Sequence, residues 1–116
     1  MNLTKLFYSK SSMKRKILDI KEDIEKLVSK DCKEKFWIDW YGAYDIDPKH
    51  LVFWICVQTD KMKLALKSNF ELINEIRNLL VKHNYPEQAR QSVFIDFESQ
   101  ETVDKESNGS WYQHFK

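Results

Sequence analysis

The chain has 116 residues, of which 42% are hydrophobic and 32% charged, with 19 Lys and Arg against 18 Asp and Glu. This length is enough for one domain with its own hydrophobic core. The balanced charge excludes a strongly basic nucleic-acid-binding class and gives no electrostatic reason for membrane binding. Only two Gly and two Pro residues occur, so we expect a few long elements joined by few turns.

The start of the sequence lacks the apolar run of a secretory signal, and no later stretch approaches the length of a membrane span. The two cysteines, Cys32 and Cys56, do not belong to a metal-binding spacing. We therefore expect a cytoplasmic protein with reduced thiols, no structural metal and no cofactor.

A first helix is predicted over residues 12–30. Ile17, Ile20 and Ile24 recur at helical spacing, and charged residues fill the other positions. Its start is open between Ser12 and an earlier cap at Thr4, because a basic run after Ser12 would oppose the helix dipole. Residues 1–11 show no clear pattern and are expected to fray.

Residues 36–59, FWIDWYGAYDIDPKHLVFWICVQT, predict two antiparallel strands joined by a tight turn near Asp47 and Pro48. The stretch carries seven aromatic residues, so the rest of the fold should be built around it. The register expected from that turn pairs Tyr44 with Leu51, Trp40 with Ile55, and Ile38 with Val57.

Alternation along the strands divides the hairpin side chains between two faces. One face is apolar and predicts a core: Phe36, Ile38, Trp40, Tyr44, Leu51, Phe53, Ile55 and Val57. The other face is too aromatic for plain solvent and too polar for a second core: Trp37, Asp39, Tyr41, Val52, Trp54, Cys56 and Gln58.

A second helix is predicted over residues 60–83, where apolar residues keep to one face: Met62, Leu66, Phe70, Ile73, Ile76 and Leu80. A competing helix start has the spacing of a capping box at Ser68–Glu71. The two interpretations differ only on whether residues 60–67 are helix or loop. Pro86 ends the helix.

A third strand is predicted over residues 93–98, where Val93, Ile95 and Phe97 alternate with Phe94, Asp96 and Glu98. Because a long helix separates it from the hairpin, this strand should pair in parallel with a hairpin strand. Residues 104–116 fit either a short edge strand or a helix, and the strand is slightly favoured.

These elements predict one α+β domain over residues 1–116, a two-layer sandwich in the order α-β-β-α-β, followed by a strand or helix. Two helices pack on one face of a mixed sheet of three to four strands. The expected core consists of Ile17, Ile20, Ile24, Ile38, Trp40, Phe53, Ile55, Phe70, Ile73, Ile76, Leu80 and Ile95.

The sheet face away from the helices is the candidate binding surface. Large exposed aromatic patches are typical of protein–protein interfaces and are uncommon on surfaces that have no partner. We expect a non-enzymatic interaction module that binds either a second copy of itself, the favoured partner, or another protein. The alternative is that the C-terminal segment with Tyr112 and Phe115 folds back and covers the face. The predicted interface residues are Trp37, Asp39, Tyr41, Trp54, Phe94, Asp96, Glu98 and Trp111.

Three carboxylates on that face, Asp39, Asp96 and Glu98, decide between the alternatives. They would repel phosphates, which argues against nucleic acid. They are also the starting point for an enzyme or a metal- or ligand-binding protein, although no catalytic motif accompanies them. If they crowd one another, neutralising one should leave stability equal or improved. An acidic run further along the tail suggests a third alternative, an immunity- or antitoxin-like inhibitor of a basic partner.

Overall fold

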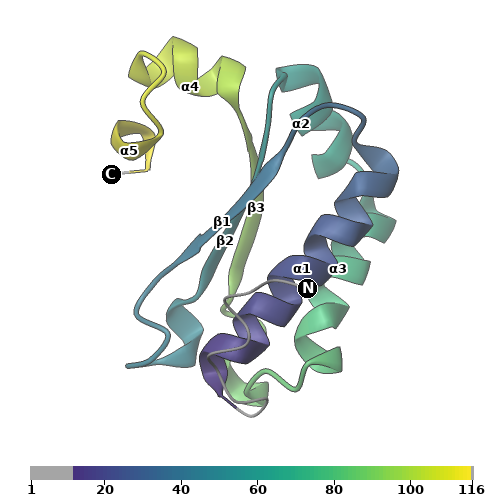
Figure 1. Ribbon diagram of the computed structural model, residues 1–116, viewed down its shortest axis with the longest axis vertical. Helices are drawn as coiled ribbons and strands as arrows, with labels where there is room; N and C mark the ends of the chain where they lie inside the picture. The colour runs from purple at the N-terminus through teal and green to yellow at the C-terminus, as the bar shows by residue number, and fades with distance from the viewer. Residues whose placement is uncertain (1–11, 116) are drawn as a thin grey trace.

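The structure, a computed structural model, describes residues 12–115 and has the α+β class that the sequence predicts (Figure 1). Within these residues the elements are α1 (Met13–Asp31), β1 (Trp37–Tyr41), a 3-10 helix (Pro48–His50), β2 (Val52–Val57), α2 (Asp60–Lys67), α3 (Phe70–Lys82), a 3-10 helix (Glu87–Ala89), β3 (Phe94–Ser99), α4 (Gln100–Ser107) and α5 (Trp111–His114). The predicted frayed segment 1–11 lies outside the described residues.

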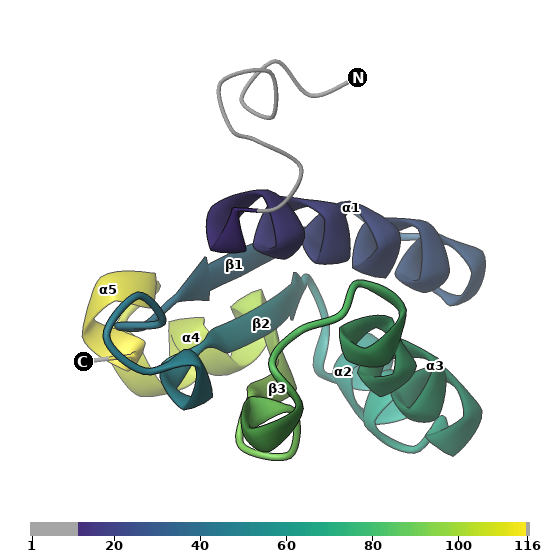
Figure 2. The ribbon, with the colours of Figure 1, turned by 90° about the horizontal axis from the view of Figure 1, so that it is seen from below.

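The sheet has the order β1-β2-β3, with β2 in the centre. β1 and β2 are antiparallel, and β2 and β3 are parallel, as the crossover argument predicts. The helices α1 and α3 lie on one side of the sheet, whereas α4 and α5 lie on the other side near one end (Figure 1, Figure 2). None of the helices within residues 12–115 is both long enough and apolar enough to cross a membrane.

The predicted hairpin register is wrong by two residues, because Trp40 pairs with Phe53 and Ile38 with Ile55. The cause is a longer connection than a tight turn. It begins at Gly42, whose φ is +111°, and includes a 3-10 helix that Asp47 caps by accepting a hydrogen bond from the Lys49 amide. Since side chains alternate with a period of two, a slip of two residues leaves both predicted faces unchanged.

The predicted core is largely confirmed on the face covered by α1 and α3. Buried members are Ile17, Ile20, Ile24, Ile38, Phe53, Ile55, Ile76 and Leu80, while Trp40, Ile73 and Ile95 are partly buried against them. Phe70 is the exception, because 74% of its surface is exposed. At the start of the core layer, Ser12 caps α1 by accepting a hydrogen bond from the Arg15 amide.

The wrong placement of Phe70 follows from a break in the predicted second helix. Residues 60–67 are helical, but α2 ends at Lys67, and Asn69 caps α3 by accepting a hydrogen bond from the Leu72 amide. The competing capping signal was therefore a real helix start, one residue later than Ser68. The break changes the buried face of α3, which now consists of Leu72, Ile76, Leu79 and Leu80.

The slightly favoured edge strand in residues 104–116 is wrong as well. After β3 the chain forms α4, capped by Ser99, and α5, capped by Ser110. Asn108 separates the two helices in the left-handed conformation, with φ at +51°. This turn sends α5 back toward the sheet.

Candidate interaction surface

The sheet face opposite α1 and α3 carries the residues that the sequence predicts for it. The register places Asp39, Trp54 and Asp96 in one row across the three strands, with Trp54 in the middle. Phe94 and Glu98 lie on the same face of β3 because they are two residues either side of Asp96. We call this surface the aromatic face.

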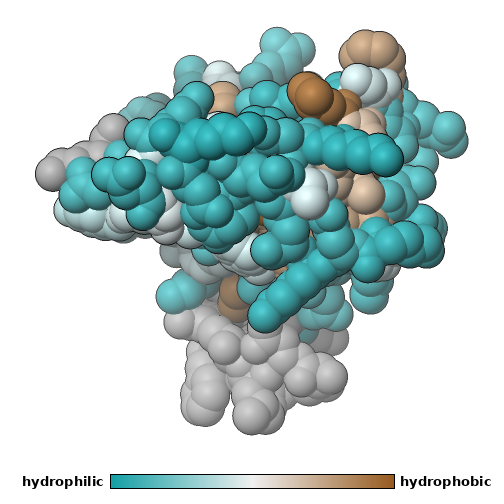
Figure 3. Space-filling model, turned by 90° about the horizontal axis from the view of Figure 1, so that it is seen from above, coloured by the Kyte–Doolittle hydropathy of each residue, from teal (hydrophilic) through white to brown (hydrophobic). Residues whose placement is uncertain are grey.

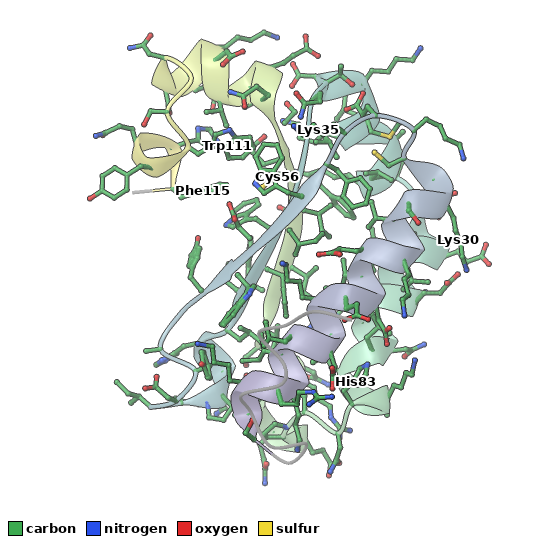
Figure 4. The ribbon with its side chains drawn as sticks, in the orientation of Figure 1. Lys30, Lys35, Cys56, His83, Trp111 and Phe115 are labelled. Atoms are coloured by element: carbon green, nitrogen blue, oxygen red, sulfur yellow. The ribbon has the colours of Figure 1, made fainter. Side chains whose placement is uncertain are left out.

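The C-terminal helices cover part of the aromatic face. The ring of Trp111 meets that of Trp37 edge-on at 5.0 Å, and Phe115 stacks on Trp54 at 4.6 Å. Figure 4 shows both tail rings reaching from α5 toward the strands, near Cys56. The alternative in which the tail folds back is therefore correct for this part of the face, and Trp37 and Trp54 are half-buried.

His114 fixes α5 to β3. Its Nε2 atom lies 2.8 Å from Glu98 Oε2, and its Nδ1 atom lies 3.1 Å from Ser107 Oγ. Glu98 also accepts hydrogen bonds from Lys63 Nζ at 3.0 Å and from the Ser99 amide at 2.9 Å. Burial raises the pKa of Glu98, but the hydrogen bonds from His114, the Ser99 amide and Lys63 outweigh it, so the pKa is lowered.

A second polar cluster holds the base of the tail. The carboxylate of Asp60, in the first turn of α2, accepts hydrogen bonds from Ser99 Oγ, Thr102 Oγ1 and Lys105 Nζ. These donors lower the pKa of Asp60 well below its ordinary value. The sequence gives no signal that these side chains meet, because their meeting depends on the parallel pairing of β2 and β3.

The three predicted carboxylates do not converge. Asp39 is exposed and accepts a long hydrogen bond from Trp37 Nε1 at 3.4 Å, whereas Asp96 pairs with Lys67 at 3.6 Å. Because Trp54 separates Asp39 from Asp96 in the row, their backbones lie two strand spacings apart, about 9–10 Å. Within residues 12–115 no group of three or more His, Cys, Asp or Glu residues could hold a metal ion.

Ser107, His114 and Glu98 form a hydroxyl–imidazole–carboxylate series of the kind found in nucleophilic catalysis. Such a nucleophile also needs N–H donors for the developing oxyanion. Ser107 is the last residue of α4, where a helix presents carbonyl oxygens instead. The series is thus better suited to anchoring α5 than to catalysis.

A groove lies between β1 and the segment of α5. It encloses about 540 Å³ and is lined by Asp39, Trp40, Tyr41, Trp111, Tyr112 and Phe115. Asp39 and Tyr41 belong to the aromatic face, whereas Trp40 belongs to the core face. The groove thus adjoins β1, which is an edge strand of the sheet. We call it the β1 groove.

Tyr41 is the aromatic side chain of β1 that remains most open, with 41% of its surface exposed and its hydroxyl accepting a hydrogen bond from Trp54 Nε1. Phe94, on the far strand, is 45% exposed and packs against Trp54 at 5.1 Å. The end of the molecule formed by α2 and α4 is mainly hydrophilic (Figure 3). The exposed apolar part of the aromatic face therefore lies next to α5 and does not extend onto the end formed by α2 and α4.

The described residues thus form an α+β domain whose second sheet face is partly covered by its own C-terminal helices, with an aromatic groove left at one sheet edge. No family model, curated protein or solved structure matches this chain.

Proposed function

We propose that the chain is a small non-enzymatic protein-interaction module, and that its first partner is a second copy of itself bound at the β1 groove. The observation that carries this proposal is the groove itself. It brings Trp40 and Tyr41 of the edge strand β1 together with Trp111 of α5. Tyr and Trp are the residues most enriched where binding energy is concentrated. Edge strands also offer backbone groups to a partner.

A small-molecule ligand is less well supported. The volume of about 540 Å³ falls within the range of roughly 300–1,000 Å³ that ligand pockets have. Such pockets, however, bring several polar groups together to orient the ligand. Among the described residues that line the groove, Asp39 is the only acidic or basic one.

Aromatic contacts alone do not supply a stable dimer. The tail already covers parts of Trp37 and Trp54, so less aromatic surface is available to a partner than an uncovered sheet face would offer. Association itself costs an estimated ~4–15 kcal/mol. The partner must therefore gain further contacts, and the backbone of β1 is the nearest source.

The second candidate partner is a basic protein, which is the kind of target that an immunity- or antitoxin-like inhibitor would bind. Asp39 lines the groove, and Asp45 and Asp47 lie in the hairpin connection that follows β1. The two candidates respond to Asp39 in opposite ways. Asp39→Asn should tighten self-association by removing like charge, but it should weaken the binding of a basic partner.

We also propose a cytoplasmic location. Support comes from Cys32 and Cys56, which are free and buried. Burial raises the pKa of Cys56 to about 12, so its thiol stays protonated and unreactive at neutral pH.

Tyr41→Glu is expected to abolish self-association while the fold persists, because a charge would enter the groove. The measurement is the molar mass by light scattering over a series of micromolar protein concentrations, with circular dichroism to check the fold. The matched control is Ile46→Glu, which adds the same charge at an exposed apolar residue in the hairpin connection. We expect dimers of the wild type and the control, and monomers of Tyr41→Glu. A wild-type monomer at every concentration contradicts self-association.

A further inference from the structure

We propose that the two copies join through the outer edges of their β1 strands, so that two three-stranded sheets become one antiparallel-joined sheet of six strands. This inference rests on the proposed self-association and adds its geometry. Extension of a sheet by a strand from a partner is a recurrent mode of recognition, in which backbone hydrogen bonds give affinity and side-chain pockets give specificity.

The opposite edge of the sheet is closed by the chain itself. On β3, the amide of Phe97 donates to the carboxylate of Asp96 at 2.8 Å, and the amide of Ser99 donates to Glu98 at 2.9 Å. The helix α2 supplies cations to the same two carboxylates, from Lys67 and Lys63. Amides that are already bonded to side chains are poor donors for an incoming strand.

The outer edge of β1 is not closed in this way. Within residues 12–115, no hydrogen bond joins the backbone of Trp37–Tyr41 to any segment on the side away from β2. In an edge strand every second residue directs its N–H and C=O away from the sheet. β1 is an edge strand of the sheet (Figure 2).

One register uses the whole strand. Two antiparallel copies of β1 related by a two-fold axis at Asp39 pair all 5 residues, whereas an axis at Ile38 pairs only residues 37–39 and an axis at Trp40 only residues 39–41. With the axis at Asp39, Trp37 faces Tyr41 of the other copy, and Ile38 faces Trp40. Aromatic and apolar cross-strand pairs of this kind stabilise sheets.

This register also keeps the faces of the two sheets continuous, because opposed residues in antiparallel strands point to the same face. Its unfavourable element is the meeting of two Asp39 carboxylates at the axis. The repulsion between these two carboxylates weakens the dimer. Asp39→Asn removes the repulsion and should tighten self-association by about two- to five-fold.

Asp39→Cys tests the geometry directly. Opposed residues in antiparallel strands have Cα atoms roughly 4.5–5.5 Å apart, within the range of roughly 4.4–6.8 Å that a disulfide spans. This variant and its control below also carry Cys56→Ala, because Cys56 contacts Asp39, whereas Cys32 is buried. Under mild oxidation we expect the variant to become a covalent dimer, seen by non-reducing electrophoresis. Asp45→Cys, in the hairpin connection and away from the axis, is the control and should stay largely monomeric on the same gel.

The outcomes separate the inference from the proposed function. If light scattering shows a wild-type dimer but Asp39→Cys links no faster than Asp45→Cys, the pairing of β1 strands is wrong while self-association stands. If the wild type is a monomer, both are wrong. Faster linking of Asp39→Cys together with a tighter Asp39→Asn dimer supports the proposed register.

Discussion

Replacing Gly42 by alanine is expected to unfold the hairpin connection and lower the stability of the whole domain. Gly42 has a φ of +111°, and a Cβ atom there would lie 1.9 Å from the backbone oxygen of His50. A strained conformation of this kind costs about 1–3 kcal/mol by itself, and the clash with fixed backbone adds to it because no flexible side chain can move aside. Chemical denaturation monitored by tryptophan fluorescence measures the loss.

Gly109→Ala is the matched control. Gly109 also has a positive φ, +80°, but its added Cβ would meet only the side chain of Asp104 at 3.1 Å. The loss of stability should therefore stay near the strain cost of about 1–3 kcal/mol. Equal losses for the two variants would contradict the importance of the close approach between Gly42 and His50.

Replacing Glu98 by glutamine is expected to loosen the tail and to cost about 1.5–3 kcal/mol at pH 7, the range for hydrogen bonds to a charged group. The side chain of Glu98 is 12% exposed, and His114 and Lys63 would lose their anionic partner. Thermal or chemical unfolding measures the change. The exposed side chain of Glu75 makes no hydrogen bond or ion pair within residues 12–115, so Glu75→Gln is the control and should change stability little.

The effect of Glu98→Gln should depend on pH in one direction. Because the folded protein lowers the pKa of Glu98 below the ordinary value of 4.5, the ionised group stabilises the fold above that value. This stabilisation is lost as the pH falls through the lowered pKa, where the folded protein binds the proton too. The difference between wild type and variant should shrink in that acidic range. A difference that is the same at pH 7 and at low pH would mean that the ion pairs do not anchor the tail.

The two faces of the hairpin could be predicted from the sequence because they depend only on alternation. The actual pairs, Trp40 with Phe53 and Ile38 with Ile55, could not, because they depend on the length of the connection. That length is set by the positive φ at Gly42 and by the capped 3-10 helix. Composition alone did not separate this connection from a tight turn.

The second helix shows where a regular pattern misleads. Phe70 keeps the helical spacing between Leu66 and Ile73, yet it is exposed because Asn69 starts a new helix in a different direction. A hydrophobic pattern gives the spacing of apolar residues along one continuous helix. It cannot show that the helix ends and that a second helix starts in another direction. The local capping signal did contain this information.

The sequence allows the tail to close over the aromatic face, but it contains no signal for the side chains that anchor the tail. Glu98 and His114 meet because Asn108 reverses the chain after α4 and because β3 places Glu98 on the face that α5 reaches. Glu98 therefore supports the tail, although the sequence suggests it as an interface residue. Asp39 and Tyr41, at the other edge, remain on the open groove.

The most direct measurement of the central claim is amide hydrogen exchange at a low and a high protein concentration, followed residue by residue. Pairing of β1 edges predicts that alternate amides within Trp37–Tyr41 become more protected as the concentration rises, while the amides of Phe97 and Ser99, already bonded to side chains, do not change. Protection in β1 that is independent of concentration would contradict the claim.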